Sequence, residues 1–175
     1  MYLLRELRRS DLPAINAWRA DRELISRLGA TFRFINQEVD ERWFNAYMDR
    51  RGSTVRCAIV DAECPDAILG LVSLCDIDNL SRSCEFHIMI GDKNQRGKGM
   101  GYFAITEILR HAFDDLNLNR VELKVLPDNE PALALYRKAG FTQEGVLRQY
   151  AFKDGEYRDT VVMSILREEW KKNGN

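Results

Sequence analysis

The sequence predicts a mixed α/β fold in which helices flank a mainly antiparallel central sheet. Three strand-like runs follow one another with only short turns between them, which is typical of an antiparallel meander. These runs are Thr54–Asp61, Ile68–Ile77 and Arg82–Ile90. Near the end of the chain, Asp154-Gly155 is a strong turn signal between two further strand-like runs, 141–153 and 157–167. Helix-like segments lie before and between these groups of strands, so helices are expected to cover the sheet.

The first fifty residues are expected to supply one strand and two main helices. Leu3–Leu7 is a short strand candidate, and Ser10 is expected to cap the first helix. A short helical piece is expected within 21–28, and a longer helix over 36–50. An apolar stripe is expected along this longer helix, formed by Val39, Trp43 and Tyr47. The first turn of the meander is expected at Pro65-Asp66.

The second half of the chain is expected to alternate helices with strands. A helix over 102–116 follows the meander, and the strand Arg120–Leu126 and the helix Glu130–Ala139 precede the final hairpin. The order along the chain is therefore β-α-α-β-β-β-α-β-α-β-β. Because the sequence contains no linker, repeat or low-complexity segment, residues 1–175 are expected to form a single domain.

Composition argues against two classes of partner. The net charge is −1, which disfavours a general affinity for nucleic acid or for anionic membranes. No apolar run is long enough to span a bilayer, and the first eleven residues lack the apolar centre of a signal peptide, so we expect a cytoplasmic protein. The four cysteines form no Cys-x-x-Cys pair and are expected to be reduced packing residues, with no metal site.

A glycine-rich loop lies between the third strand of the meander and the following helix, at Arg96–Gly101. The first turn of a helix has unpaired backbone N–H groups and carries partial positive charge, so it attracts anions. Glycines let the backbone approach a phosphate closely. Gly97-Lys98 is followed by Gly99 rather than by Ser or Thr, which argues against a Walker loop, and the glycine spacing does not fit a Rossmann fingerprint. The loop predicts a pyrophosphate site.

A second motif begins at Asn129 and ends at Phe141. Asn129 is a good helix N-cap, Tyr136 shares a helix face with Ala132, and Gly140 can end the helix in the left-handed conformation. This segment resembles the Asn-x-x-Ala-x-x-x-Tyr-x-Lys-x-Gly-Phe signature of the GCN5-related N-acetyltransferases (GNAT). The loop Arg96–Gly101 likewise resembles their acetyl-CoA loop. The sequence around both motifs resembles the branch of this family that contains ribosomal-protein N-terminal, spermidine and amino-sugar acetyltransferases.

The resemblance implies an acetyl-CoA-dependent N-acetyltransferase and identifies residues that would hold the cofactor. Backbone amides of the loop would bind the pyrophosphate, the end of the third meander strand would pair with the pantetheine arm, and two residues of the second motif would add contacts. These residues are Gln95, Arg96, Gly97, Lys98, Gly99, Met100 and Gly101 in the loop, Ile88, Met89 and Ile90 on the strand, and Asn129 and Lys138. In the family, this strand diverges from the next one and opens a V-shaped slot.

Two residues are the candidates for catalysis. The resemblance implies that Tyr136 protonates the departing thiolate as a general acid, and an ordinary phenol suits that task. Glu85 would either accept a proton from the amine or anchor a cationic acceptor, and the sequence leaves both roles open. His87 shares a strand face with Glu85 and is expected to be structural, although an imidazole is suited to proton transfer.

The acceptor and the assembly stay open at this stage. The acceptor is a small-molecule or peptide amine, and a protein N-terminus, a polyamine or an amino sugar all fit the resemblance. A polyamine would require acidic groups in the cleft, which Glu38, Asp40, Glu41 and Glu85 could supply. The alternatives to acetyl transfer are a non-catalytic acyl-CoA sensor and an enzyme that uses another acyl-CoA, such as succinyl-CoA. A homodimer is compatible with the sequence but not required by it.

Overall fold

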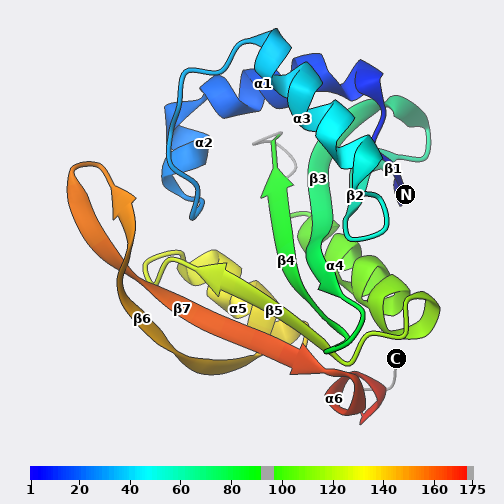
Figure 1. Ribbon diagram of the computed structural model, residues 1–175, viewed down its shortest axis with the longest axis vertical. Helices are drawn as coiled ribbons and strands as arrows, with labels where there is room; N and C mark the ends of the chain where they lie inside the picture. Colours follow the sequence, from blue (N-terminus) through cyan, green and yellow to red (C-terminus); the bar gives the residue numbers. More distant parts are fainter. Residues whose placement is uncertain (92–96, 173–175) are drawn as a thin grey trace.

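A seven-stranded sheet forms the centre of the computed structural model, which describes residues 1–91 and 97–172. The strands lie side by side in the order β1-β2-β3-β4-β5-β7-β6 (Figure 1). Their bounds are β1 Tyr2–Glu6, β2 Val55–Asp61, β3 Cys64–Asp78, β4 Ser83–Ile90, β5 Arg120–Val125, β6 Thr142–Lys153 and β7 Glu156–Leu166. Every neighbouring pair is antiparallel except β4 and β5. This architecture confirms the predicted mixed α/β fold.

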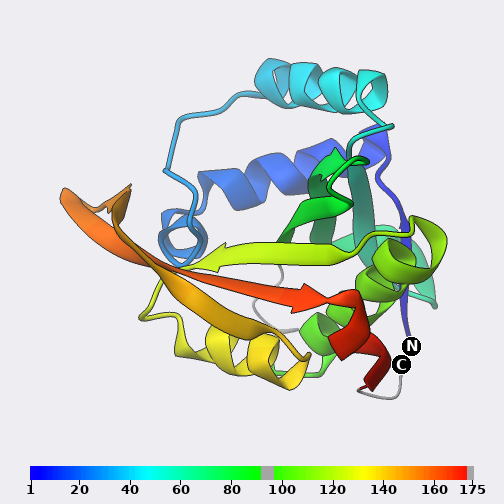
Figure 2. The same ribbon diagram turned by 60° about the horizontal axis from the view of Figure 1, so that its bottom comes forward.

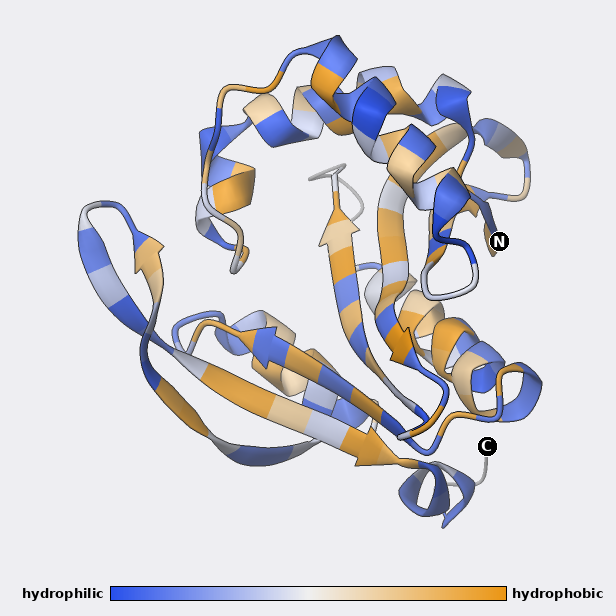
Figure 3. Cartoon of the chain, viewed as in Figure 1, coloured by the Kyte–Doolittle hydropathy of each residue, from blue (hydrophilic) through white to orange (hydrophobic). Residues whose placement is uncertain are grey.

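Helices cover both faces of the sheet (Figures 1 and 2). One group, before β2, packs through a small apolar cluster that includes Ile15, Phe44 and Leu71. The other group packs through the main core, which includes the α4 residues Ile105 and Ile108. The helical elements are η1 Arg9–Asp11, α1 Leu12–Ala20, α2 Arg22–Ser26, α3 Gln37–Asp49, α4 Met100–Arg110, the π-helical turn η3 His111–Asp115, α5 Glu130–Lys138 and α6 Arg167–Lys172. Figure 3 shows that α4 and β7 carry much of the apolar sequence, whereas α6 is polar.

The sheet opens between β4 and β5. These strands pair only at their starts, where Ser83–Glu85 of β4 lies beside Arg120–Glu122 of β5. Beyond this short contact they point away from each other, as Figure 1 shows. The β3 side of β4, in contrast, is paired as far as Ile90. The divergence that the family resemblance implies is therefore present, and it leaves the second half of β4 without a strand partner on its β5 side in the described part of the chain.

Several local predictions are confirmed, but those for the N-cap of α1 and for the turn between β2 and β3 are wrong. Asn36 caps α3 by accepting a hydrogen bond from the Val39 amide at 3.1 Å. Ser10, however, lies within η1 and does not cap α1. The first turn of the meander is at residues 62–63 rather than at Pro65-Asp66, which lies within β3. The reason is that the Asp61 carboxylate accepts the Glu63 amide at 3.1 Å and starts the turn early.

The predicted apolar stripe of α3 is confirmed at Trp43 and Tyr47, which pack in the smaller apolar cluster, and is wrong at Val39. Val39 is 46% exposed, whereas Asp40 is fully buried. The burial of this carboxylate is possible because it pairs with Arg19 and accepts a hydrogen bond from Asn16 at 2.7 Å. Helix α6 was not predicted; its Trp170 is buried against Phe113. Within the described residues, no helix is long and apolar enough to cross a membrane.

Candidate active site

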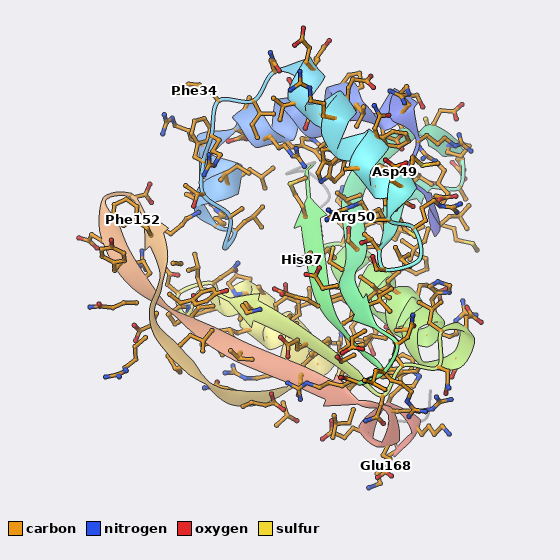
Figure 4. The ribbon with its side chains drawn as sticks, viewed as in Figure 1. Phe34, Asp49, Arg50, His87, Phe152 and Glu168 are labelled. Atoms are coloured by element: carbon orange, nitrogen blue, oxygen red, sulfur yellow. The ribbon has the colours of Figure 1, made fainter. Side chains whose placement is uncertain are left out.

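A cavity of about 560 Å³ lies where β4 and β5 diverge. Its walls come from both halves of the molecule: from the segment 19–43 and from β2 to β7 and α5. A volume of this size is typical of small-molecule sites. Figure 4 shows His87 on β4, beside the space between the two halves of the sheet. The cavity contains most of the sequence-predicted strand and helix residues and several that the sequence did not indicate.

The glycine loop has the geometry of an anion site in its described part. Gly97 and Gly99 have φ of 76° and 84°, a conformation that side-chain-bearing residues rarely adopt, and no atom lies within 4 Å of a Cβ placed on either. Gly99 is the N-cap of α4, so the first amides of this helix, which have no partner within the helix, begin at the loop. These residues fit a pyrophosphate. The predicted contacts of Gln95 and Arg96 lie outside the described residues.

The remaining loop residues have different surroundings. Gly101 serves packing, because a Cβ there would lie 2.9 Å from the Leu135 side chain of α5. The Met100 side chain is buried in the core, so only its backbone is available to a ligand. Lys98 is exposed, and Lys138 places its ammonium 4.7 Å from the ring centre of Tyr102, one residue after Gly101. Both cations therefore lie beside the start of α4.

The end of β4 forms one edge of the slot. Ile88 and Met89 line the cavity, whereas Ile90 is partly buried against the main core. Because β5 diverges after Glu85, backbone groups of β4 beyond this point are available to an extended ligand. Gly91 follows directly, and a Cβ there would lie 1.8 Å from the Trp18 ring, so α1 packs closely against this end of the strand.

Tyr136 lines the cavity from α5 and is 8% exposed. Its ring packs edge-to-face on Phe86 at 6.1 Å and also contacts Phe141. Burial raises the pKa of Tyr136 to about 12. The phenol therefore keeps its proton throughout the physiological range, as a proton donor must.

Asn129 lines the cavity and also has two structural bonds. Its side-chain oxygen accepts the Ala132 amide at 3.3 Å, which confirms it as the N-cap of α5. Its amide nitrogen donates to the Arg27 carbonyl at 3.0 Å. Asn129 thus connects α5 with the segment after α2. Lys153 holds the same segment, donating to the carbonyls of Ile25 and Leu28 at 2.8 Å each.

Glu85 and His87 point into the cavity from the same face of β4. Lys124 of β5 donates to Glu85 Oε2 at 2.9 Å, and His87 Nε2 lies 3.8 Å from Glu85 Oε1. Desolvation by the cavity walls lowers the pKa of His87, and the nearby Glu85 carboxylate partly opposes this shift. His87 is therefore neutral at pH 7, and its accessible imidazole can accept a proton.

Sequence analysis did not indicate two cationic residues of the opposite wall of the cavity, Arg19 and Arg56. Arg56 of β2 and Arg19 of α1 both stack on Trp43 of α3, with their guanidinium carbons 4.6 and 4.5 Å from the ring centre. Arg56 is directly opposite Ser73 in the strand register, and Ser73 is directly opposite His87. The three form a polar row across β2, β3 and β4. Because side chains alternate along a strand, the sequence can assign Arg56 to one face of β2. Only the strand register shows that Ser73 and His87 lie beside it on the same face of the sheet.

Comparisons with known proteins agree with this geometry. A family model described as acetyltransferase (GNAT) domain matches residues 2–142. The spermidine N(1)-acetyltransferase of Vibrio cholerae is 32% identical over 95% of this chain and 94% of that protein. The L-amino acid N-acetyltransferase AaaT of Escherichia coli is 29% identical over 73% of this chain and 77% of that protein.

A solved structure gives the same result. The crystal structure of spermidine N-acetyltransferase from Vibrio cholerae in complex with CoA and spermine has a TM-score of 0.89 at 30% identity, covering 97% of this chain and 98% of that chain. The family match extends over most of the sequence. The chain therefore belongs to the GNAT acetyltransferase family and is an acetyl-CoA-dependent N-acetyltransferase.

Proposed function

We propose that this enzyme transfers the acetyl group to the primary amine of a small molecule by direct attack, with both substrates bound together in the 560 Å³ cavity. The observation that carries the proposal is the composition of the lining. One continuous surface contains the open edge of β4, the Tyr136 phenol and the Glu85–His87 pair. An acyl donor, a proton donor and a proton acceptor can therefore meet without movement of the backbone.

In the proposed reaction, the neutral amine nitrogen attacks the thioester carbonyl carbon. The new C–N bond forms, the C–S bond breaks, and the products are the acetylated amine and free coenzyme A. His87 takes the proton that the amine loses, and Tyr136 gives a proton to the departing sulfur. Glu85 is already ion-paired with Lys124, which supports a role in orienting His87 and the amine rather than the role of base.

The acidity of Tyr136 fits a buried leaving group. A phenol of pKa about 12 is a weak donor to an ordinary thiolate of pKa ~8.5. Burial in this protein, however, raises thiol pKa values by similar amounts: that of Cys57 to about 11 and that of Cys84 to about 12. A thiolate desolvated to the same extent as it leaves would be comparably basic, so the proton could pass from the phenol to the sulfur.

A polyamine acceptor, which the names of the spermidine acetyltransferases suggest, finds little support in the charges of the cavity. Of the four acidic residues that could have received a polycation, only Glu85 lines the cavity. Asp40 is buried and paired with Arg19, and Glu41 pairs with Arg9. Glu38 is exposed at the start of α3. We therefore propose a small-molecule amine other than a polycation.

The test is free-thiol release from acetyl-CoA with an acceptor panel of amino sugars, amino acids, a short peptide and spermidine, beside acetyl-CoA binding measured by calorimetry. We expect acetyl-CoA to bind and at least one small-molecule amine to be turned over. Absence of acetyl-CoA binding by well-folded protein would overturn the proposed function. Turnover confined to the peptide or to spermidine would overturn the acceptor class.

A further inference from the structure

The charge of the cavity is strongly one-sided. Five cationic side chains and one carboxylate line it, and the carboxylate of Glu85 is already bonded to Lys124. The cationic side chains are Arg19, Arg27, Arg33, Arg56 and Lys124. Arg27 is paired with Glu23 at the surface, 3.1 Å away. The excess positive charge therefore belongs mainly to the wall formed by α1, β2 and the segment after α2.

Arg56 is the central residue of this wall, and its bonds are incomplete. Its guanidinium lies over Trp43 and Tyr47, and Nη1 donates to Ser73 Oγ at a long 3.4 Å. Its Nε atom is buried with no hydrogen-bond partner, and no carboxylate pairs with Arg56 among residues 1–91 and 97–172. An unpaired buried donor on a charged group is costly, so such a group is expected where a ligand completes its bonds.

Arg19 places a second guanidinium next to the first. Both stack on Trp43. Burial lowers the pKa of Arg19, the Asp40 carboxylate opposes this shift, and the like charge of Arg56 adds to it. The fully buried Asp40 carboxylate pairs with Arg19 and neutralises its charge. The charge of Arg56, in contrast, has no paired carboxylate among the described residues and is the one that an anionic ligand would complete.

A third group without a partner lies in the same cavity. Thr160 of β7 is 3% exposed, lines the cavity, and its hydroxyl has no hydrogen-bond partner in the described residues. Only three buried side-chain atoms in the described part of the chain lack partners, and two of them, on Arg56 and Thr160, belong to this lining. Orphan polar groups that gather at one cavity indicate that its ligand is polar on more than one side.

We propose that the acceptor amine carries an anionic group, a carboxylate or a phosphate, that Arg56 and Arg19 bind while the amine lies at His87 and Glu85. This inference rests on the proposed function and names its substrate class. His87 and Arg56 are separated by one intervening strand, so their Cα atoms lie about 10 Å apart. The spacing favours acceptors whose anion is several bonds away from the amine, and the same cations repel a polyamine.

The first experiment measures anion binding without turnover. Protein saturated with CoA, so that the glycine loop is filled, is heated in inorganic phosphate, in acetate or in chloride of matched ionic strength. We expect phosphate or acetate to raise the melting temperature of the wild type above the chloride value. The gain should be lost in Arg56→Gln and kept in Arg42→Gln, which removes the same charge from the exposed side of α3. An equal gain in wild type and Arg56→Gln, or no gain at all, would overturn the inference.

The second experiment compares acceptors in matched pairs by free-thiol release. Glucosamine 6-phosphate is paired with glucosamine, and 5-aminopentanoate with pentylamine, so that the arms separate phosphate from carboxylate. We expect kcat/KM to be at least about tenfold higher for the anionic member of one pair, since a charge-assisted hydrogen bond is worth that much. Arg56→Gln should reduce the ratio of the two kcat/KM values to near one. Arg56→Lys keeps the charge but loses the paired N–H donors of the guanidinium, so it should restore part of the ratio.

The outcomes separate the two proposals. Equal turnover of both members of each pair, or faster turnover of spermidine, would overturn the anionic acceptor and leave acetyl transfer intact. If no member of the panel is turned over, the phosphate measurement decides the inference, because it needs no reaction. Failure of acetyl-CoA to bind would overturn the proposed function instead.

Discussion

The cavity has one wall near α5 and another near α1 and β2. The two walls differ in how the chain brings their functional groups into position. Tyr136 and Asn129 stand on or at the start of one helix, and the glycines stand on one loop, so short stretches of chain determine their positions. Arg19, Trp43 and Arg56 come from a helix, another helix and a strand, and meet only because α1 and α3 pack against the sheet. In the proposed function, the first wall serves acetyl-CoA, whereas scattered substitutions could change the charge of the second wall.

The difference indicates where specificity is determined. The cofactor side has a fixed chemical task, and a compact motif can encode it. The proposed acceptor side is built on the helices and strands before β4, and it is held to the C-terminal half by Asn129 and Lys153. Substitutions on the cofactor side are therefore expected to lower turnover with every acceptor, and those on the other wall to change which acceptor is used.

The largest expected effect is that of Tyr136→Phe. Loss of a general acid typically costs at least about 100-fold in rate, so kcat should fall by that order with every acceptor while the Kd of acetyl-CoA stays unchanged. Steady-state kinetics and calorimetry check the two values. Tyr157→Phe, at the exposed tip of the hairpin, is the matched control. A rate that survives in Tyr136→Phe would remove the proton-donor role.

Gly91→Ala tests the contact between α1 and the end of β4. A Cβ at Gly91 would overlap the Trp18 ring, so the free energy of unfolding should fall by about 1–3 kcal/mol. Chemical denaturation measures the change, and Gly52→Ala, whose Cβ would meet no atom within 4 Å, should cost far less. Adding Trp18→Ala should cost less in the Gly91→Ala background than alone. Full stability of Gly91→Ala would show that α1 does not press on the end of β4.

His87→Gln tests the proton acceptor. The lowered pKa of His87 means that wild-type kcat should fall as pH drops through a value below ~6.5, because only neutral imidazole accepts a proton. His87→Gln should lose this step and about tenfold in kcat at pH 8, which is less than the usual general-base effect of about 100-fold or more. Glu85→Gln should move the step to lower pH, since the Glu85 charge raises the pKa of His87. An unchanged pH profile in both variants would exclude His87.

The smallest expected effect is that of Thr160→Val. Removing a buried hydroxyl without a partner should leave the free energy of unfolding unchanged or raise it by up to about 1 kcal/mol. The KM of the acceptor should rise a few-fold if the hydroxyl binds it. Thr106→Val, which loses a hydroxyl bonded to the Tyr102 carbonyl at 2.9 Å, should instead lower stability slightly. A clear loss of stability in Thr160→Val would mean that the hydroxyl has a partner.

The sequence predicted the fold class and most elements because hydrophobic alternation and turn residues act locally. Asn129, Tyr136 and the glycine loop lie in contiguous motifs, so the resemblance to the GNAT family could identify them from the sequence. The sequence could not predict that Asp40 would be buried in place of Val39, because that depends on Arg19 and Asn16 from another helix. Nor could it relate Arg56 to His87, which lie on separate strands and meet through Ser73. Here the long-range register, not the local pattern, determines the chemistry.

The most direct test of the account is the initial-velocity pattern when acetyl-CoA and the acceptor are both varied. If the two substrates meet in one cavity between Tyr136 and His87, double-reciprocal plots must intersect, since neither product can leave before both substrates bind. Parallel lines would contradict the account, because they would mean that an acetylated protein forms first and that the amine arrives after coenzyme A has gone.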